Sequence, residues 1–167
     1  ELPDLGGNPF GRAILQRCAE KGYSLYLLGA KQEVIARAAQ NFAKWHPGLK
    51  IVGFHHGYFT SEETDDIITK INTANPDLLM VCFGKPNEVF WIADNFEKLN
   101  ARVIIPMGGF FDFQSGHTKR APEWLIKLRF EWLFRLLLEP RRLWKRYVIG
   151  NSIFMARVFR YKLTGKN

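Results

Sequence analysis

Short apolar runs alternate with longer segments of helical spacing through the first hundred residues of the chain. The segments at 32–45, 60–74 and 87–99 place apolar residues three and four positions apart, which predicts helices with one buried face. Buried strands are expected at the short apolar runs: residues 24–30, 49–54, 77–83 and 101–106. Strands that alternate with helices in this way predict β-α-β units, and therefore an α/β fold with a parallel sheet flanked by helices.

A different pattern begins at Pro122. Proline is favoured in the first turn of a helix, and Glu131 and Arg135 have the spacing of an ion pair along one helix face. One helix is therefore expected from Pro122 onward. Pro140 should break or kink it, and a second helix should begin at Arg141.

The basic residues are concentrated in the last third of the chain. Residues 1–116 have a charge balance of −2 and residues 117–167 one of +10, within a net charge of +8. We therefore expect a core at 1–116 and a basic amphipathic helical appendage at 117–167, packed together as one domain. Such a basic surface indicates a polyanionic partner: nucleic acid, an anionic membrane face or a phosphorylated substrate.

Three interpretations of the basic helices stay open at this point. They can be core helices with a solvated basic face. They can lie on a membrane surface, since Trp124, Trp132, Phe134 and Trp144 are interleaved with arginine and lysine. They can bind nucleic acid, but no RNP, KH or helix-turn-helix pattern supports this, and we do not expect nucleic acid as a partner. No uncharged apolar run reaches the roughly 18 residues of a membrane span.

The cysteines and histidines do not indicate a metal site. Cys18 and Cys82 lie in apolar or amphipathic segments and are expected to be reduced, buried thiols. His55, His56 and His117 are not at metal-ligand spacing. Neither a Gly-x-Gly-x-x-Gly nor a Walker phosphate-binding motif is present, which argues against a dinucleotide enzyme and a P-loop NTPase. We therefore expect no cofactor, and the histidine spacing leads us to expect no metal.

Each predicted strand is followed by a loop that starts with glycine. The four loops begin with Gly29-Ala30-Lys31, Gly53–Tyr58, Gly84–Glu88 and Gly108–Asp112. Glycine permits either a sharp turn or a close ligand, and the carboxyl ends of parallel strands meet at one edge of the sheet. Four such loops together favour a ligand site, and Arg120 lies well placed in sequence to contact phosphate oxygens.

The chain resembles the WecG/TagA/CpsF bacterial glycosyltransferases over residues 2–158. Six strings carry the resemblance: residues 22–29 (GYSLYLLG), 46–59 (HPGLKIVGFHHGYF), 76–84 (PDLLMVCFG), 108–116 (GGFFDFQSG), 119–124 (KRAPEW) and 131–147 (EWLFRLLLEPRRLWKRY). The last three, in this order, are highly specific. The resemblance implies a Rossmann-like core with a C-terminal helical appendage that engages the membrane.

The resemblance also implies a reaction. It is the inverting, metal-independent transfer of a sugar from a UDP-sugar to a polyprenyl-diphosphate-linked acceptor, in the synthesis of bacterial surface polysaccharides such as teichoic acid linkage units and exopolysaccharides. The expected partners are the donor, the acceptor and an anionic membrane surface, with a homo-oligomer left open. The expected location is cytoplasmic, peripheral on the inner face of the plasma membrane.

The resemblance and the loop pattern together supply the candidate site residues. The substrate-binding candidates are Gly29, Tyr58, Gly84, Lys85, Pro86, Glu88, Gly108, Gly109, Asp112 and Arg120. The candidates for the diphosphates or the lipid side are Arg135, Arg141, Arg142 and Arg146.

Three departures from the family pattern matter for catalysis. The family's general base is expected upstream of Glu1, so no catalytic residue is assigned within this chain. Gly7-Asn8-Pro9 stands where an acid is usual. Pro86-Asn87-Glu88-Val89 stands for Pro-Lys-Gln-Glu, so that a carboxylate replaces an amide, and this carboxylate would repel a diphosphate unless it faces a sugar hydroxyl. The alternative to an enzyme is a non-catalytic UDP-sugar-binding or assembly subunit of a polysaccharide machine.

Overall fold

The computed structural model describes residues 8–118, 121–122, 124–125, 128, 130–138, 140–144 and 149–164. The chain divides into two compact units, Glu1–Lys119 and Arg120–Asn167. Each unit is described by itself.

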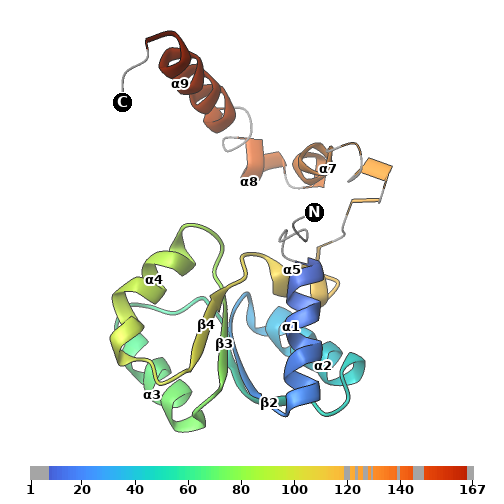
Figure 1. Ribbon diagram of the computed structural model, residues 1–167, viewed down its shortest axis with the longest axis vertical. Coiled ribbons are helices and arrows are strands. Elements are labelled where there is room, and N and C mark those ends of the chain that lie inside the picture. Colours follow the sequence, from blue (N-terminus) through green and yellow to red (C-terminus); the bar gives the residue numbers. More distant parts are fainter. Residues whose placement is uncertain are drawn as a thin grey trace. The chain divides into compact units, whose positions relative to one another are not determined.

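The first unit is built on a parallel sheet (Figure 1). Its four strands follow the order β2-β1-β3-β4, and every neighbouring pair is parallel. They are β1 (Ser24–Gly29), β2 (Lys50–His55), β3 (Leu78–Cys82) and β4 (Val103–Pro106). Each lies within two residues of a predicted strand, so the α/β, Rossmann-like fold class is confirmed.

Helices cover both faces of this sheet (Figure 1). They are α1 (Asn8–Lys21), α2 (Gln32–Trp45), α3 (Thr64–Ala74), α4 (Asn87–Asn95) with the 3-10 turn η1 (Phe96–Lys98), and α5 (Phe110–Gln114). Helices α1 and α2 lie on one face, and α3 and α4 on the other. The sequence pattern predicted α2, α3 and α4 but not α1 or α5. Helix α1 has few buried apolar side chains, and α5 is too short to show a helical period.

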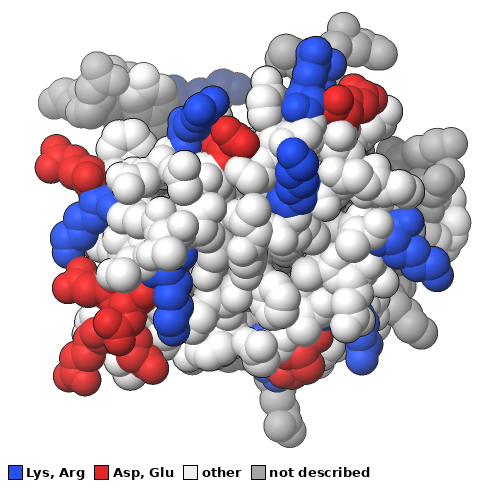
Figure 2. Space-filling model, turned by 90° about the horizontal axis from the view of Figure 1, so that it is seen from below, with Lys and Arg blue, Asp and Glu red and all other residues white. Residues whose placement is uncertain are grey.

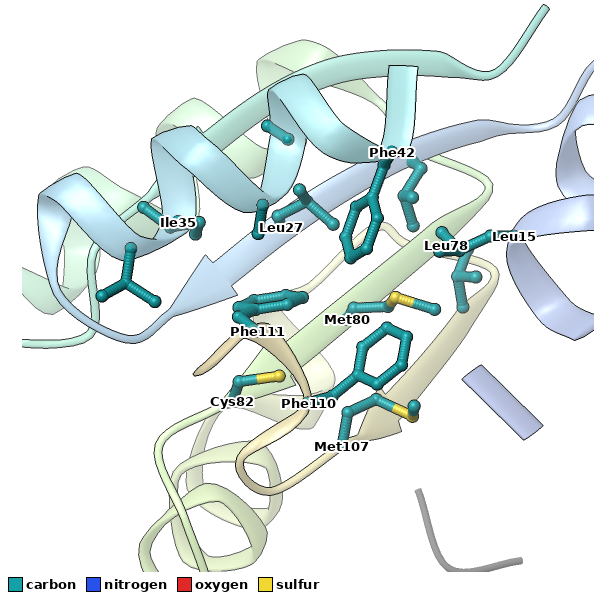
Figure 3. Close-up of a cluster of buried hydrophobic side chains, with 14 of the residues drawn as sticks. Leu15, Leu27, Ile35, Phe42, Leu78, Met80, Cys82, Met107, Phe110 and Phe111 are labelled. Carbon is teal, nitrogen blue, oxygen red and sulfur yellow. The ribbon is translucent and has the colours of Figure 1, made fainter. Parts of the chain in front are cut away.

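The alternation of side chains along each strand explains the continuous apolar runs. In β1, Leu25 and Leu27 point to the core under α1, α2 and α5, while Tyr26 and Leu28 join the core under α3. A strand covered on both faces must be apolar at every position. Figure 3 shows the first of these cores, in which Phe42 of α2 packs against Phe110 and Phe111 of α5.

A polar contact joins the beginnings of β1 and β3. The Ser24 amide and hydroxyl both donate to Oδ2 of Asp77 at 2.9 Å, and the Asp77 amide donates to the Ser24 hydroxyl at 2.9 Å. The hydrogen bonds from Ser24 lower the pKa of Asp77, and Arg102 nearby lowers it further. Figure 2 views the molecule from this end of the sheet, where basic and acidic side chains both occur on the surface.

Most of the described residues of the second unit are helical. Its helices are α7 (Glu131–Leu138), α8 (Pro140–Trp144) and α9 (Asn151–Thr164). A helix does begin at Pro140, but Glu139 before it lies outside the described residues, so the break or kink expected there stays a prediction. The single helix expected from Pro122 is wrong, because Phe130 lies outside the helix and its amide donates to the Leu125 carbonyl, five residues back. Among the described residues, no helix is long and apolar enough to cross a membrane.

Candidate functional site

The loops that follow the four strands are joined to one another at the carboxyl edge of the sheet. The Gly57 amide donates to the Ala30 carbonyl at 2.9 Å, and the Ala30 amide donates to the Cys82 carbonyl at 3.0 Å. The Met107 amide donates to the Val81 carbonyl at 2.8 Å. The strand order is β2-β1-β3-β4, so β2 is added on one side of β1, and β3 and β4 are added on the other. Open α/β sheets bind ligands at such a switch point, here between β1 and β3.

Two glycines of this edge are required by packing. Gly29 has a φ of +137°, and a Cβ there would collide with the Cys82 carbonyl. A Cβ on Gly57 would lie 2.9 Å from the Gly29 Cα and 2.7 Å from the Phe83 ring. Gly29 is also buried, so its conformation is explained by the close approach of two strands without any ligand.

Three other glycines have no close contact at the Cβ position. Gly84 has a φ of +80° and nothing within 4 Å of its Cβ position. Gly108 has a φ of +63°, and its nearest neighbour is Oε1 of Glu88 at 4.0 Å. A Cβ on Gly109 would meet only ordinary contacts, with Oδ2 of Asp112 at 3.6 Å. The backbone of these two loops is therefore open to close approach by a ligand.

Glu88 lies between the same two loops. Its side chain is 0% exposed. Oε2 accepts the Gly108 amide at 2.9 Å and the Gly84 amide at 3.2 Å, and Oε1 accepts the Gly108 amide at 3.1 Å. Burial raises the pKa of Glu88, while the backbone amides and the Lys85 ammonium oppose that rise. The carboxylate thus faces backbone amides, and the sugar hydroxyl expected beside it would have no access to a side chain buried in this way.

Asp112 lies in α5 and is partly exposed. Its backbone carbonyl accepts the Thr118 amide at 3.0 Å and the Ser115 hydroxyl at 3.1 Å. The neighbouring Phe110 and Phe111 are buried in the core, 2% and 0% exposed, and fix the position of α5. The Asp112 carboxylate is therefore held beside the open backbone of the β4–α5 loop.

The loop after β2 is polar at its tip and aromatic at its base. Tyr58 is 72% exposed, and its amide donates to Nδ1 of His56 at 3.3 Å. Phe59, Phe83 and Trp91 pack edge to face, with ring centroids 5.5–6.3 Å apart. These ring contacts join the loop after β2 to the loop after β3 and to α4. Among the described residues, no group of histidine, cysteine and acidic side chains could hold a metal ion.

The cysteines are buried and unpaired, as expected. Cys82 ends β3 directly beneath the loops, and burial raises the pKa of its thiol well above the ordinary value. Burial likewise raises the pKa of Cys18, with the charge of Asp77 adding to the effect. Both thiols are therefore protonated and inert packing groups at neutral pH.

The structure gathers the glycines, Tyr58, Lys85, Pro86, Glu88 and Asp112 at one edge. Arg120 and Arg146 lie outside the described residues, and the side chains of Arg135, Arg141 and Arg142 are not described. Their roles stay predictions.

Comparison with known proteins identifies the family. The model of the "Glycosyl transferase WecG/TagA/CpsF family" matches residues 6–167. The chain belongs to this family. It is 34% identical over 142 residues to the N-acetylglucosaminyldiphosphoundecaprenol N-acetyl-beta-D-mannosaminyltransferase of Bacillus subtilis (strain 168), and 32% identical over 142 residues to the protein of the same name in Bacillus spizizenii. Each match covers 85% of this chain and 54% of the relative. This family member thus spans about half the length of those relatives.

Two features of the site were not found from the sequence. Ala30 has a φ of +55°, and nothing in its own residue type signals that conformation. The second feature is the pair of contacts made by Glu88. Its contact with the Gly84 amide is local, because an acidic side chain in the first turn of a helix can accept backbone amides that precede the helix. Its contact with Gly108, twenty residues further on, had no local signal.

Proposed function

We propose that this family member binds the nucleotide diphosphate of a UDP-sugar at the open backbone of the loops after β3 and β4. The observation that carries the proposal is the pair Gly84 and Gly108, which have a left-handed backbone and no close neighbour at the Cβ position, at the carboxyl edge of a parallel sheet. Membership of a glycosyl transferase family supplies the substrate class. Lys85 is exposed in the β3–α4 loop and can pair with a phosphate oxygen.

The proposed reaction is transfer of the sugar to a polyprenyl-diphosphate-linked acceptor, as the names of the two relatives describe for their own substrates. A hydroxyl of the acceptor attacks the anomeric carbon, the bond from that carbon to the UDP oxygen breaks, and the hydroxyl proton passes to a base. Both oxygens of Glu88 are occupied by backbone amides, so Glu88 is not that base. A general base for this proton would contribute about 10²–10⁴-fold in rate.

Asp112 gives the direct test of the donor site. Asp112→Ala should weaken UDP-sugar binding about tenfold or more. The variant removes a carboxylate that can accept a hydrogen bond from a hydroxyl of the UDP-sugar, and hydrogen bonds to a charged group are worth about 1.5–3 kcal/mol. Calorimetric titration with UDP and a panel of UDP-sugars, with and without EDTA, measures this, and EDTA should not change the affinity. Asp66→Ala, which removes an exposed acid of α3, is the matched control.

Equal affinities for the wild type and Asp112→Ala would remove Asp112 from the site. Binding of a UDP-sugar without transfer to a lipid-linked acceptor would instead favour the alternative, a UDP-sugar-binding or assembly subunit.

We propose further that the second unit holds the protein on an anionic membrane surface. Helix α9 exposes large apolar side chains between basic ones: Ile153, Phe154, Met155, Val158, Phe159 and Tyr161 are 42–64% exposed. Basic and aromatic residues in one helix are typical of interfacial binding, and each basic residue near an anionic surface adds about 1 kcal/mol.

Removing three charges from the second unit tests this attachment. Replacing Arg141, Arg142 and Arg146 with alanine should reduce sedimentation with anionic liposomes, most strongly at low salt, because about 3 kcal/mol of attraction is lost. The control replaces three exposed basic residues of the first unit, Lys31, Arg37 and Lys44, which removes the same charge. Equal loss of sedimentation in both variants would show that net charge, and not this surface, is responsible.

A further inference from the structure

The buried carboxylate of Glu88 is costly in its present position. An ionised carboxylate loses its hydration on burial, and hydrogen bonds must replace it. Here the replacements come from Gly84 and Gly108, which belong to two different loops. A carboxyl group that a fold keeps buried at such cost is often found at a functional site.

The two amides that Glu88 accepts belong to the two glycines with open backbone. Gly84 and Gly108 both have left-handed φ values, which a side chain would strain, and both lack close neighbours at the Cβ position. The Met107 amide is bound to Val81, so the start of the β4–α5 loop is already fixed to β3. Glu88 adds the link between the loop tips.

We infer that Glu88 is a positioning residue, whose carboxylate joins the β3–α4 loop to the β4–α5 loop and sets the spacing of Gly84 and Gly108 around the donor's diphosphate. The inference rests on the proposed function for its ligand and on the hydrogen bonds for its geometry. Glu88 touches no substrate and acts through the backbone of the two loops.

The link has a signature that does not depend on any ligand. If one carboxylate accepts both amides, then the NMR shifts of the Gly84 and Gly108 amide protons should titrate with one shared midpoint. Burial places that midpoint above the ordinary pKa range of glutamate, because it disfavours the charged form. The charged or titratable groups around it are Lys85, Cys82 and Asp112. Burial raises the pKa of the Cys82 thiol, which therefore stays protonated in an acidic titration.

The experiment compares Glu88→Gln and Glu88→Ala with wild type. Both variants should lose the shared titration and exchange the Gly84 and Gly108 amides faster with solvent. Glu97→Gln, which changes an exposed glutamate of η1, should keep both properties of the wild type.

UDP titration then connects the link to binding. Glu88→Gln should weaken UDP affinity about tenfold or more while its urea midpoint stays close to that of the wild type, since a neutral side chain relieves the cost of the buried charge. A merely structural glutamate would lower stability and leave UDP affinity unchanged in the folded protein, which would overturn the inference. Separate midpoints, or none, at the two wild-type amides would overturn it as well. A wild-type protein that titrates as expected but does not bind UDP would instead contradict the proposed function.

Discussion

Replacing Gly29 with alanine should lower the free energy of unfolding by about 2 to 5 kcal/mol. A left-handed backbone costs a side chain about 1–2 kcal/mol, and forcing an extra group into a packed interior costs about 1–3 kcal/mol more. At this position the new Cβ meets the backbone of Cys82, which belongs to the central strand β3 and is held by its pairing with β1, so that it cannot move away. Urea unfolding followed by circular dichroism measures the change.

Gly116→Ala is the matched control for this change. Gly116 also has a positive φ, +76°, but nothing lies within 4 Å of its Cβ position. Only the backbone term remains, so we expect a loss of about 1–2 kcal/mol. If the two variants lose the same stability, then the approach of β1 to β3 is not what requires glycine at residue 29.

The second large effect is expected for Phe111→Ala, at about 3–5 kcal/mol of unfolding free energy. Phe111 is 0% exposed and packs edge to face against Phe42, with ring centroids 6.2 Å apart (Figure 3). The core around it is formed by β1, β3, α2 and α5 and cannot close over the lost ring without moving a strand. Truncation therefore leaves a cavity beneath α5.

Because α5 also carries Asp112, this core variant should affect the site as well. We expect weaker UDP binding by Phe111→Ala at temperatures where the protein remains folded, and a smaller effect for Phe111→Leu, which fills much of the space. Phe96→Ala removes a ring that is 62% exposed and should change stability by about 0.5 kcal/mol or less. Unchanged UDP affinity in a destabilised Phe111→Ala would show that α5 does not position the donor site.

The sequence by itself determined the sheet and the edge at which a ligand can bind. Apolar runs such as 24–30 are short and continuous, which is typical of strands covered on both faces, and the loops after the strands begin with glycine. Parallel strands bring those loops together whatever the details of packing. The burial of both cysteines likewise follows from residue type and local pattern.

Only the tertiary structure decided what each residue does at that edge. Gly29 and Gly84 look alike in the sequence, yet the first meets the backbone of a neighbouring strand and the second meets open space. Glu88 looked like a ligand for a sugar and lies instead under two loops, with a partner twenty residues away. Local spacing reports which residues share a strand or a helix face, but contacts between loops depend on how several elements pack, and no single segment contains that information.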